Sequence, residues 1–335
     1  MNGVKNLTKR SAGRLLFRLG CSAPRMKPWL KSWGLRTSKE WFAWQRGAVQ
    51  LQGGRSFYLG SIDQNYMSLE LFWRGADYYE PITTRVLAEL LNAGGTFLDL
   101  GANIGFHSLV QAAMNLDLKV VAFEPNPKLF RILSDNAAFN ARDRITCVPC
   151  ALSDTEGTAL LHLSESDMSA SLRDDFDPHR TGTTEVVRTE SLDHFLTDFA
   201  KNERVVIKVD VEGQEERFLV GARETLSLRQ PDLIMEVALR FSEQSNAILK
   251  DRGYHFYQIT DKGLIESPEL VPVTRGHLVF LNYLVSTNPP EWANALFARI
   301  ADSVQRLDLS QTSKYVDDDC IRSLDTRRSS YDSVE

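Results

Sequence analysis

The chain has 335 residues, of which 43% are apolar and 25% are charged, a composition typical of globular proteins rather than fibrous or disordered ones. That length allows one large domain with additions or two small ones. No apolar run approaches the roughly 18 residues that a membrane-spanning helix requires. The net charge of −5 is unfavourable for nucleic-acid binding by the main body of the chain.

Residues 1–46 form a basic, tryptophan-rich N-terminal arm. They contain eleven Lys or Arg against one acid, Glu40, a net charge of +10, so the remaining residues carry −5 − 10 = −15. Four of the six tryptophans lie here: Trp29, Trp33, Trp41 and Trp44. Three interpretations fit this arm: contact with an anionic membrane surface, a transit peptide, or a cap packed on the acidic body. We predict peripheral membrane contact, and no secretory signal because Arg14 and Arg18 interrupt the apolar stretch.

Two flanking segments are expected around the central domain. Residues 47–95 form a lead-in or cap, with short strand-like pieces such as residues 56–59 and a helix over residues 78–91. Residues 289–335 provide one amphipathic helix followed by an acidic, mobile tail.

Strands and helices alternate from residue 96 to residue 288. The predicted strands lie near residues 96–100, 118–123, 144–148, 204–210, 232–238, 254–259 and 277–285. The predicted helices lie near residues 104–115, 127–140, 191–200, 213–228 and 242–252. This alternation predicts an α/β domain with a mostly parallel sheet and helices on both of its faces. Two further strands within residues 155–190 surround a polar loop, which is placed to cover a site at the carboxyl edge of the sheet.

The four cysteines do not form a disulfide framework in a chain of this length. Cys147 and Cys150 have C-x-x-C spacing, but no second pair completes a zinc site, so we expect both to pack in the core. This use of cysteine indicates a reducing compartment and a cytoplasmic protein.

A glycine-rich turn follows the first predicted strand of the sheet. The apolar run 97–100 ends at Gly101, Asn103 follows, and a helical pattern begins beside Gly105. Glycines at a strand-to-helix turn let the backbone approach a ligand at the helix N-terminus. Glu124 ends the next strand, where an acid can accept hydrogen bonds from two ribose hydroxyls. These features predict a site for a nucleoside cofactor.

The turn lacks the G-x-G-x-x-G pattern of dinucleotide sites. Asp99, two residues before Gly101, would repel a pyrophosphate but attract an ammonium or sulfonium group. We therefore predict S-adenosylmethionine as the cofactor, because its amino-acid end is zwitterionic and it carries no phosphate.

Four stretches resemble the motifs of the FkbM-type S-adenosylmethionine-dependent methyltransferases, in the same order and with similar spacing. They are residues 97–109, 121–127, 151–154 and 207–215, and the resemblance extends over roughly residues 78–285. It implies a Rossmann-like class I methyltransferase fold with a seven-stranded, mostly parallel sheet. It also implies that residues of the first three stretches hold the cofactor, with Asp154 near the adenine. These residues are Asp99, Gly101, Asn103, Gly105, Glu124 and Asp154.

The fourth stretch supplies candidate catalytic residues. On an extended strand Lys208, Asp210 and Glu212 share one side, and three charges on a central strand must pair, bind a ligand or reach the open end of the sheet. A structural alternative is a Lys208–Asp210 ion pair with Glu212 at the helix start. The resemblance favours Asp210 as the group that orients or deprotonates the acceptor. Lys208 would then set the local charge, and Glu212 would contact the substrate.

Two further residues could contribute to the site. Glu236 ends the next strand at the analogous position, where it could line the acceptor pocket or lie at the surface. His107 lies one turn into the helix after the glycine turn, where a lone histidine is more often structural. Carboxylates such as Asp210, Glu212 and Glu236 do not by themselves establish a metal site, so no metal is predicted.

Methylation of a hydroxyl needs a base or a cation beside it, because an alcohol has a very high pKa. We predict a methyltransferase that acts on a hydroxyl of a sugar, a glycan or a secondary metabolite, with no nucleic-acid partner. Two alternatives stay open: a methyltransferase-like binding or scaffold protein without turnover, and a nicotinamide-dependent oxidoreductase.

Overall fold

The structure is a computed structural model that describes eight stretches of the chain. They are residues 46–62, 65–141, 143–164, 170–173, 180–198, 203–236, 242–271 and 282–309. The predictions for the basic arm, apart from residue 46, and for the acidic tail lie outside these residues. Within the described stretches, no helix combines the length and the apolar character that crossing a bilayer would require.

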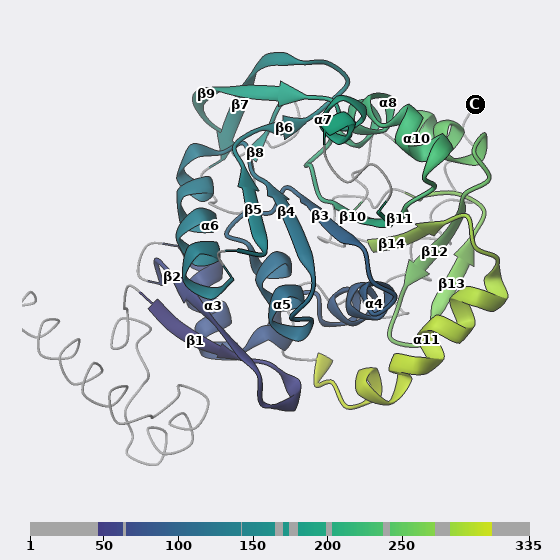
Figure 1. Cartoon of the computed structure of the whole chain (residues 1–335), viewed down its shortest axis with the longest axis horizontal. Coiled ribbons are helices and arrows are strands. Elements are labelled where there is room, and N and C mark those ends of the chain that lie inside the picture. The colour runs from purple at the N-terminus through teal and green to yellow at the C-terminus, as the bar shows by residue number, and fades with distance from the viewer. Residues whose placement is uncertain are drawn as a thin grey trace, which may run out of the picture.

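An eight-stranded sheet forms the centre of the molecule (Figure 1). Its strand order is β13-β12-β14-β11-β10-β3-β4-β5. The five strands from β11 to β5 are parallel, whereas β14 runs antiparallel to both of its neighbours. The bounds in chain order are β3 (Thr96–Leu100), β4 (Lys119–Phe123), β5 (Ile145–Val148), β10 (Val205–Val209), β11 (Asp232–Glu236), β12 (His255–Ile259), β13 (Leu264–Ser267) and β14 (Asn282–Ser286).

All seven predicted strands of the central domain are present in this sheet, and one strand was not predicted. The additional strand, β13, pairs antiparallel with β12 at the outer edge. The predicted strand 204–210 ends one residue early, at Val209. The prediction of a mostly parallel sheet is confirmed, with eight strands instead of seven.

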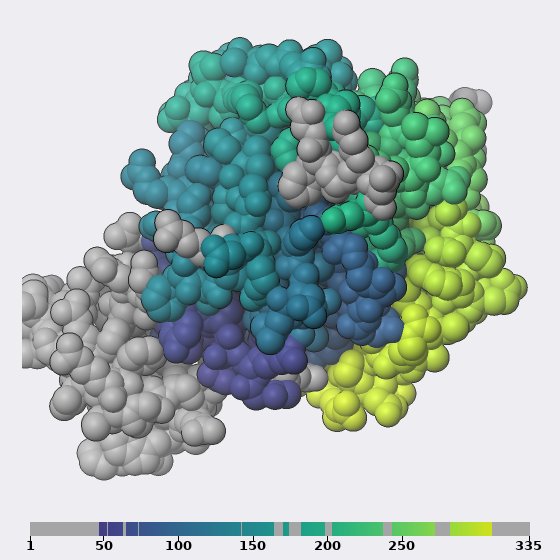
Figure 2. Space-filling model, in the orientation of Figure 1, coloured from purple at the N-terminus to yellow at the C-terminus, as the bar shows by residue number. Residues whose placement is uncertain are grey.

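Helices cover both faces of the sheet, and each face has its own hydrophobic core. One core receives side chains from α4 (Pro81–Leu91), α5 (Phe106–Met114), α6 (Pro127–Asn140) and α11 (Pro290–Gln305). The other receives them from α7 (Leu192–Asp198), α8 (Glu215–Gly221), α9 (Arg223–Leu228) and α10 (Ser242–Lys250). Neighbouring residues of a central strand point to opposite cores: Val206 belongs to the first and Ile207 to the second. In Figure 2, α11 (yellow) lies along the outer surface of the molecule.

A smaller, four-stranded sheet interrupts the alternation, with the strand order β6-β9-β7-β8. Its strands are β6 (Ala151–Leu152), β7 (Gly157–Ser164), β8 (Ala170–Ser171) and β9 (Arg180–Glu190). The two strands predicted within residues 155–190 are β7 and β9, which pair antiparallel. Ser171 Oγ donates a hydrogen bond to the carbonyl oxygen of Glu212 at 2.6 Å, so this sheet reaches the loop that follows β10.

The lead-in segment, residues 47–95, packs into the core that α4, α5, α6 and α11 form on one face of the sheet. It contains the hairpin β1 (Arg46–Gln50) and β2 (Ser56–Gly60), the helix α3 (Tyr66–Arg74), and the 3-10 helices η2 (Gln52–Gly54) and η3 (Ala76–Tyr78). The amide of Gly60 donates to Asn136 Oδ1 of α6 at 2.7 Å, and the amide of Tyr58 donates to Asn140 Oδ1 at 2.7 Å. These two bonds join the hairpin to α6. The predicted helix 78–91 begins at Pro81, after η3, and Gln111 Nε2 of α5 donates a hydrogen bond to the carbonyl oxygen of its Thr84 at 3.1 Å.

Candidate active site

The glycine turn connects β3 to α5 at the carboxyl edge of the sheet. Gly101, Asn103 and Gly105 all have positive φ angles, of 74°, 54° and 90°, a conformation that favours glycine and, after it, asparagine. A Cβ atom on Gly101 would lie 1.9 Å from the carbonyl oxygen of Asp210. Only glycine fits there, and the turn is in contact with the end of β10.

Glu124 follows β4 and is 5% exposed. Its Oε2 accepts a hydrogen bond from the amide of Asn103, and its Oε1 accepts one from the amide of Asn126, both at 2.8 Å. Burial raises the pKa of Glu124 to about 7 against the opposing effect of these two amides, and the negative charges of Asp99 and Asp210 raise it further. Since a carboxylate oxygen has two acceptor positions, each oxygen can still accept a hydrogen bond from a ligand hydroxyl.

Asp99 and Asp154 have different surroundings. Asp99 is buried on β3, and its Oδ2 accepts hydrogen bonds from the amide of Ser108 at 3.1 Å and from Ser108 Oγ at 2.6 Å, which join β3 to α5. Asp154 follows β6, accepts a hydrogen bond from Ser153 Oγ at 3.0 Å, and lies against Gly221 of α8. The cofactor role of each stays a prediction.

Lys208 and Asp210 form an ion pair at the end of β10, with 2.8 Å between Nζ and Oδ2. Lys208 is 2% exposed, and burial alone would lower the pKa of its ammonium. Nearby carboxylates outweigh burial and raise this pKa above its ordinary value; in order of effect they are Asp210, Glu80, Asp99 and Glu236. The ion pair of the structural alternative is therefore present, and it stands beside the glycine turn.

Glu212 does not share a strand face with this pair, so that part of the sequence prediction is wrong. β10 ends at Val209, and Glu212 adopts a left-handed conformation with a φ angle of 50°, which turns the chain away from the strand direction. Its contact with the substrate stays a prediction. Glu215, which was not predicted as a site residue, is buried at the first position of α8 and accepts a hydrogen bond from the amide of Gly213 at 3.1 Å. Burial raises the pKa of Glu215 to about 7.

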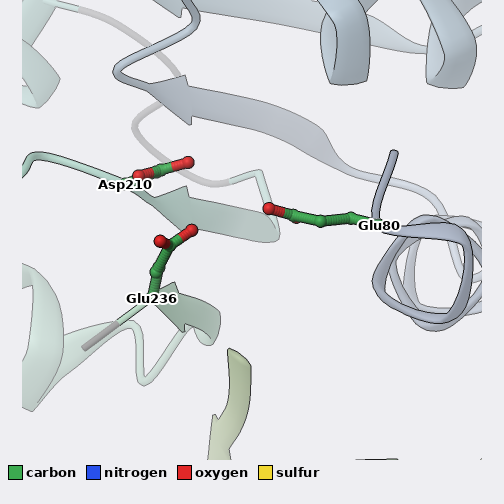
Figure 3. A group of neighbouring side chains, drawn as sticks. All are labelled: Glu80, Asp210 and Glu236. Atoms are coloured by element: carbon green, nitrogen blue, oxygen red, sulfur yellow. The ribbon is translucent and has the colours of Figure 1, made fainter. Parts of the chain in front are cut away.

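Glu80 was also not predicted, yet it lies within the site. It directly precedes Pro81 of α4 and has a left-handed φ angle of 43°, although a residue before proline is normally extended. One carboxylate oxygen each of Glu80, Asp210 and Glu236 lies within 4.8 Å of the other two. In Figure 3, Glu80 reaches from the start of α4 toward the two acids at the ends of neighbouring strands.

His107 is buried on α5, and its Nε2 lies 3.2 Å from Glu80 Oε2. His107 thus contacts the acid cluster through Glu80. Glu80 precedes the first strand of the sheet, and no motif in the sequence marks it. The available signal was its position immediately before Pro81, which begins a helix.

Comparison with known families identifies the domain. Residues 99–256 match the methyltransferase FkbM domain family. The chain contains a methyltransferase FkbM domain.

Two curated relatives of this methyltransferase are distant. A hexuronic acid methyltransferase of Haloferax volcanii is 27% identical over 195 residues, which cover 56% of this chain and 75% of the relative. A methyltransferase of Sordaria araneosa is 28% identical over 191 residues, covering 47% of this chain and 72% of the relative.

Solved structures are more distant still. The structure of an FkbM methyltransferase from Methylobacillus flagellatus has a TM-score of 0.36 and 18% identity, covering 57% of this chain and 43% of that chain. P. horikoshii TYW2 in complex with MeSAdo has a TM-score of 0.38 and 16% identity, covering 80% of this chain and 84% of that one. The methyltransferase has the class I methyltransferase-like α/β fold, with a mixed, mostly parallel sheet.

The methyltransferase fold brings two of the predicted groups together. The amide of Asn103 donates to the Glu124 carboxylate, and the amide of Gly101 donates to the carbonyl oxygen of Phe123, the residue before Glu124. The Lys208–Asp210 pair touches the same turn through the Gly101–Asp210 contact. Cys147 and Cys150 are not part of this site. Cys150 is buried, Cys147 is partly buried, and neither forms a disulfide, in keeping with the expected core packing.

Proposed function

We propose that this methyltransferase binds S-adenosylmethionine at the turn 101–105 and methylates a hydroxyl group of a sugar or glycan. The observation that carries the proposal is the direct packing of Gly101 on Asp210. This contact supports the proposal, because a methyl donor bound at the turn would lie next to an acceptor hydroxyl bound beside the ion-paired Asp210 carboxylate.

The residues of the turn fit the cofactor in three respects. The Glu124 carboxylate is held by two amides, with acceptor capacity left for the ribose hydroxyls. Asn103 Oδ1 is buried and has no hydrogen-bond partner among the described residues, so it offers an acceptor to a donor group of the ligand. Asp99 lies below the turn, where its negative charge favours the ammonium of the amino-acid end.

Asp210 is the residue best placed to act on the acceptor. S-adenosylmethionine supplies a methyl group on a sulfonium, and transfer requires an in-line approach by an oxygen lone pair. Asp210 accepts the hydroxyl proton as the new C–O bond forms, or orients the hydroxyl through a hydrogen bond. Lys208 fixes the position of the Asp210 carboxylate through their ion pair, because the raised pKa of its ammonium keeps it charged.

A sugar acceptor is favoured by the Haloferax volcanii relative, which is a hexuronic acid methyltransferase. The family match makes the nicotinamide-dependent alternative unnecessary. The other alternative, a methyltransferase-like binding or scaffold protein, can be distinguished by experiment because it predicts cofactor binding without a methylated product.

The test is transfer of label from S-adenosylmethionine to a panel of free sugars, hexuronic acids and glycosides by the full-length chain. We expect a labelled methyl ether on at least one sugar hydroxyl, and tight binding of S-adenosylhomocysteine but not of NAD. Binding of S-adenosylhomocysteine with no labelled product from sugars or from cell extract would favour the binding-protein alternative. A product labelled at a carboxylate or an amine would keep the cofactor and refute the hydroxyl acceptor.

A further inference from the structure

Three carboxylates from separate parts of the chain converge at the acceptor end of the site. Glu80 comes from the start of α4, Asp210 follows β10 and Glu236 ends β11, and one oxygen of each lies within 4.8 Å of the others (Figure 3). Opposite oxygen ligands of a calcium ion lie about 4.8 Å apart, and those of a magnesium ion about 4.2 Å apart, since the metal–oxygen distances are about 2.4 and 2.1 Å. One cation can therefore contact all three oxygens after side-chain adjustments alone.

A fourth oxygen-bearing side chain stands opposite one of these acids in the sheet. Asn282, the first residue of β14, is directly opposite Glu236 in the antiparallel register, so both side chains stand on the same face of the sheet. Asn282 is 8% exposed, and its Oδ1 has no hydrogen-bond partner within the described part of the chain. A buried amide oxygen without a donor is unfavourable, and amide oxygens are ordinary ligands of hard cations.

Lys208 is the positive group already present beside these acids. Its ammonium is bonded to Asp210 Oδ2, and one ammonium balances the charge of one of the three carboxylates. The second oxygen of Asp210 is not part of that bond. His107 lies 3.2 Å from Glu80 Oε2, where a ring N–H would hold the orientation of that carboxylate, as outer-shell partners of metal ligands do.

We propose that Glu80, Asp210, Glu236 and Asn282 form a binding site for a hard divalent cation such as Mg²⁺, Mn²⁺ or Ca²⁺. The use of the site rests on the proposed function: oxygens of the acceptor complete the coordination, and a hydroxyl bound to the cation loses its proton more easily, which reduces the demand on Asp210 as a base. The cation also allows an acidic sugar to approach a cluster of carboxylates that would otherwise repel it.

The first experiment measures binding without any acceptor. The full-length chain, saturated with S-adenosylhomocysteine, is titrated with Mn²⁺ and free Mn²⁺ is followed by electron paramagnetic resonance. We expect one saturable site per chain, with Mn²⁺ displaced by Mg²⁺ or Ca²⁺. Absence of a saturable site, with S-adenosylhomocysteine bound normally, overturns the proposal.

Two substitutions with opposite expected effects locate the site. Glu236→Gln removes a ligand charge and is expected to weaken Mn²⁺ binding by about 10–100-fold or more, since even outer-shell partners contribute that much. Asn282→Asp adds a ligand charge and is expected to strengthen binding, because affinity follows the charge count of the ligands. Glu266→Gln, at a half-exposed position on the edge strand β13, is the matched control and leaves binding unchanged.

Two further measurements distinguish loss of the metal site from misfolding and from failure of the proposed function. Each variant is first shown to bind S-adenosylhomocysteine; if Glu236→Gln fails this check, the strengthening by Asn282→Asp decides, and equal affinity in that variant and the parent overturns the site. Full methyl transfer in the presence of EDTA, from a protein without a Mn²⁺ site, overturns the site and retains the proposed function. Specific Mn²⁺ binding by a protein that methylates nothing supports the site and refutes the function.

Discussion

Gly101 and Asp210 are in backbone contact: a Cβ atom on Gly101 would lie 1.9 Å from the carbonyl oxygen of Asp210. The amide of Asp210 also donates a hydrogen bond to the carbonyl of Leu100 at 3.1 Å. The glycine turn and the end of β10 are therefore fixed to one another by main-chain atoms.

Replacement of Gly101 by Ala should disturb both halves of the site. The substitution places a methyl group against rigid backbone and imposes a left-handed conformation, which together are expected to lower the free energy of unfolding by about 2–5 kcal/mol. Gly94→Ala is the control, because Gly94 also has a positive φ angle but no atom within 4 Å of a Cβ; its expected cost is about 1–2 kcal/mol. Urea unfolding compares the two, and equal losses would mean that the contact with Asp210 is easily relieved.

Replacement of Glu124 by Ala should weaken cofactor binding. Two hydrogen bonds to a charged acceptor are lost, a decrease in binding free energy on the order of 2–4 kcal/mol, and the amides of Asn103 and Asn126 lose their acceptor as well. Calorimetric titration with S-adenosylhomocysteine measures the change, with Glu266→Ala as the surface control. An unchanged affinity would remove Glu124 from the ribose site.

Cofactor affinity should depend on pH through Glu124. Its pKa in the folded protein without ligand is raised to about 7, and the ionised form is the better acceptor for two hydroxyls. Affinity for S-adenosylhomocysteine is therefore expected to fall as the pH drops below about 7, approaching tenfold per pH unit for one proton. Glu124→Ala should lose this dependence.

The same raised pKa has the opposite consequence for stability. Between the unfolded value, near 4.3, and the folded value of about 7, the folded protein binds the proton more tightly than the unfolded chain does. The contribution of Glu124 to stability thus falls as the pH rises through this range, and Glu215, with a pKa also raised to about 7, acts in the same direction. Thermal melting of the parent and of Glu124→Ala from about pH 5 to about pH 7 measures the difference; a parallel dependence in both proteins contradicts it.

Replacement of Asp210 by Asn should lower turnover and spare cofactor binding. Loss of a general base typically reduces the rate by about 10²–10⁴-fold. The variant also leaves the buried Lys208 ammonium without its partner, and breaking a buried ion pair typically costs about 3–5 kcal/mol of stability, so rates must be compared well below the melting temperature. Near-normal turnover in Asp210→Asn would make the pair purely structural.

Deletion of residues 1–45 tests the proposed role of the basic arm. Each basic residue near an anionic membrane contributes roughly 1 kcal/mol, so the full chain is expected to sediment with anionic vesicles at low salt and the deleted chain is not. The deleted chain should keep its affinity for S-adenosylhomocysteine. Strong destabilisation of the deleted chain, from a parent that never bound vesicles, would instead support the packed-cap interpretation.

The sequence predicts the central sheet well because its buried parallel strands are continuous apolar runs. β13 escaped prediction because it is an edge strand, with Ile265 and Glu266 exposed, so neither an apolar run nor a clear alternation marks it. The single helix predicted over 213–228 is two helices, α8 and α9. α8 ends at Gly221, where a Cβ would lie 1.9 Å from the carbonyl oxygen of Ser153; this close approach of a distant segment cannot be read from the local sequence.

The glycine turn and Glu124 were more predictable from the sequence than the acid cluster of Glu80, Asp210 and Glu236. Gly101, Gly105 and Glu124 follow consecutive elements, and the turn and the next strand end mark them in the sequence. Glu80 and Asn282 come from opposite ends of the domain. The packing of α4 brings Glu80 near Asp210, and the register of β14 places Asn282 opposite Glu236. The displacement of Glu212 follows from one positive φ angle at a non-glycine residue.

The segment shared with the family, residues 99–256, contains the glycine turn, Asp210 and Glu236, whereas Glu80 and Asn282 fall outside it. A match to the family over this segment thus says nothing about which residues stand at the two outer positions. The cation site proposed above has to be tested in each relative separately, because two of its four ligands come from outside the shared segment.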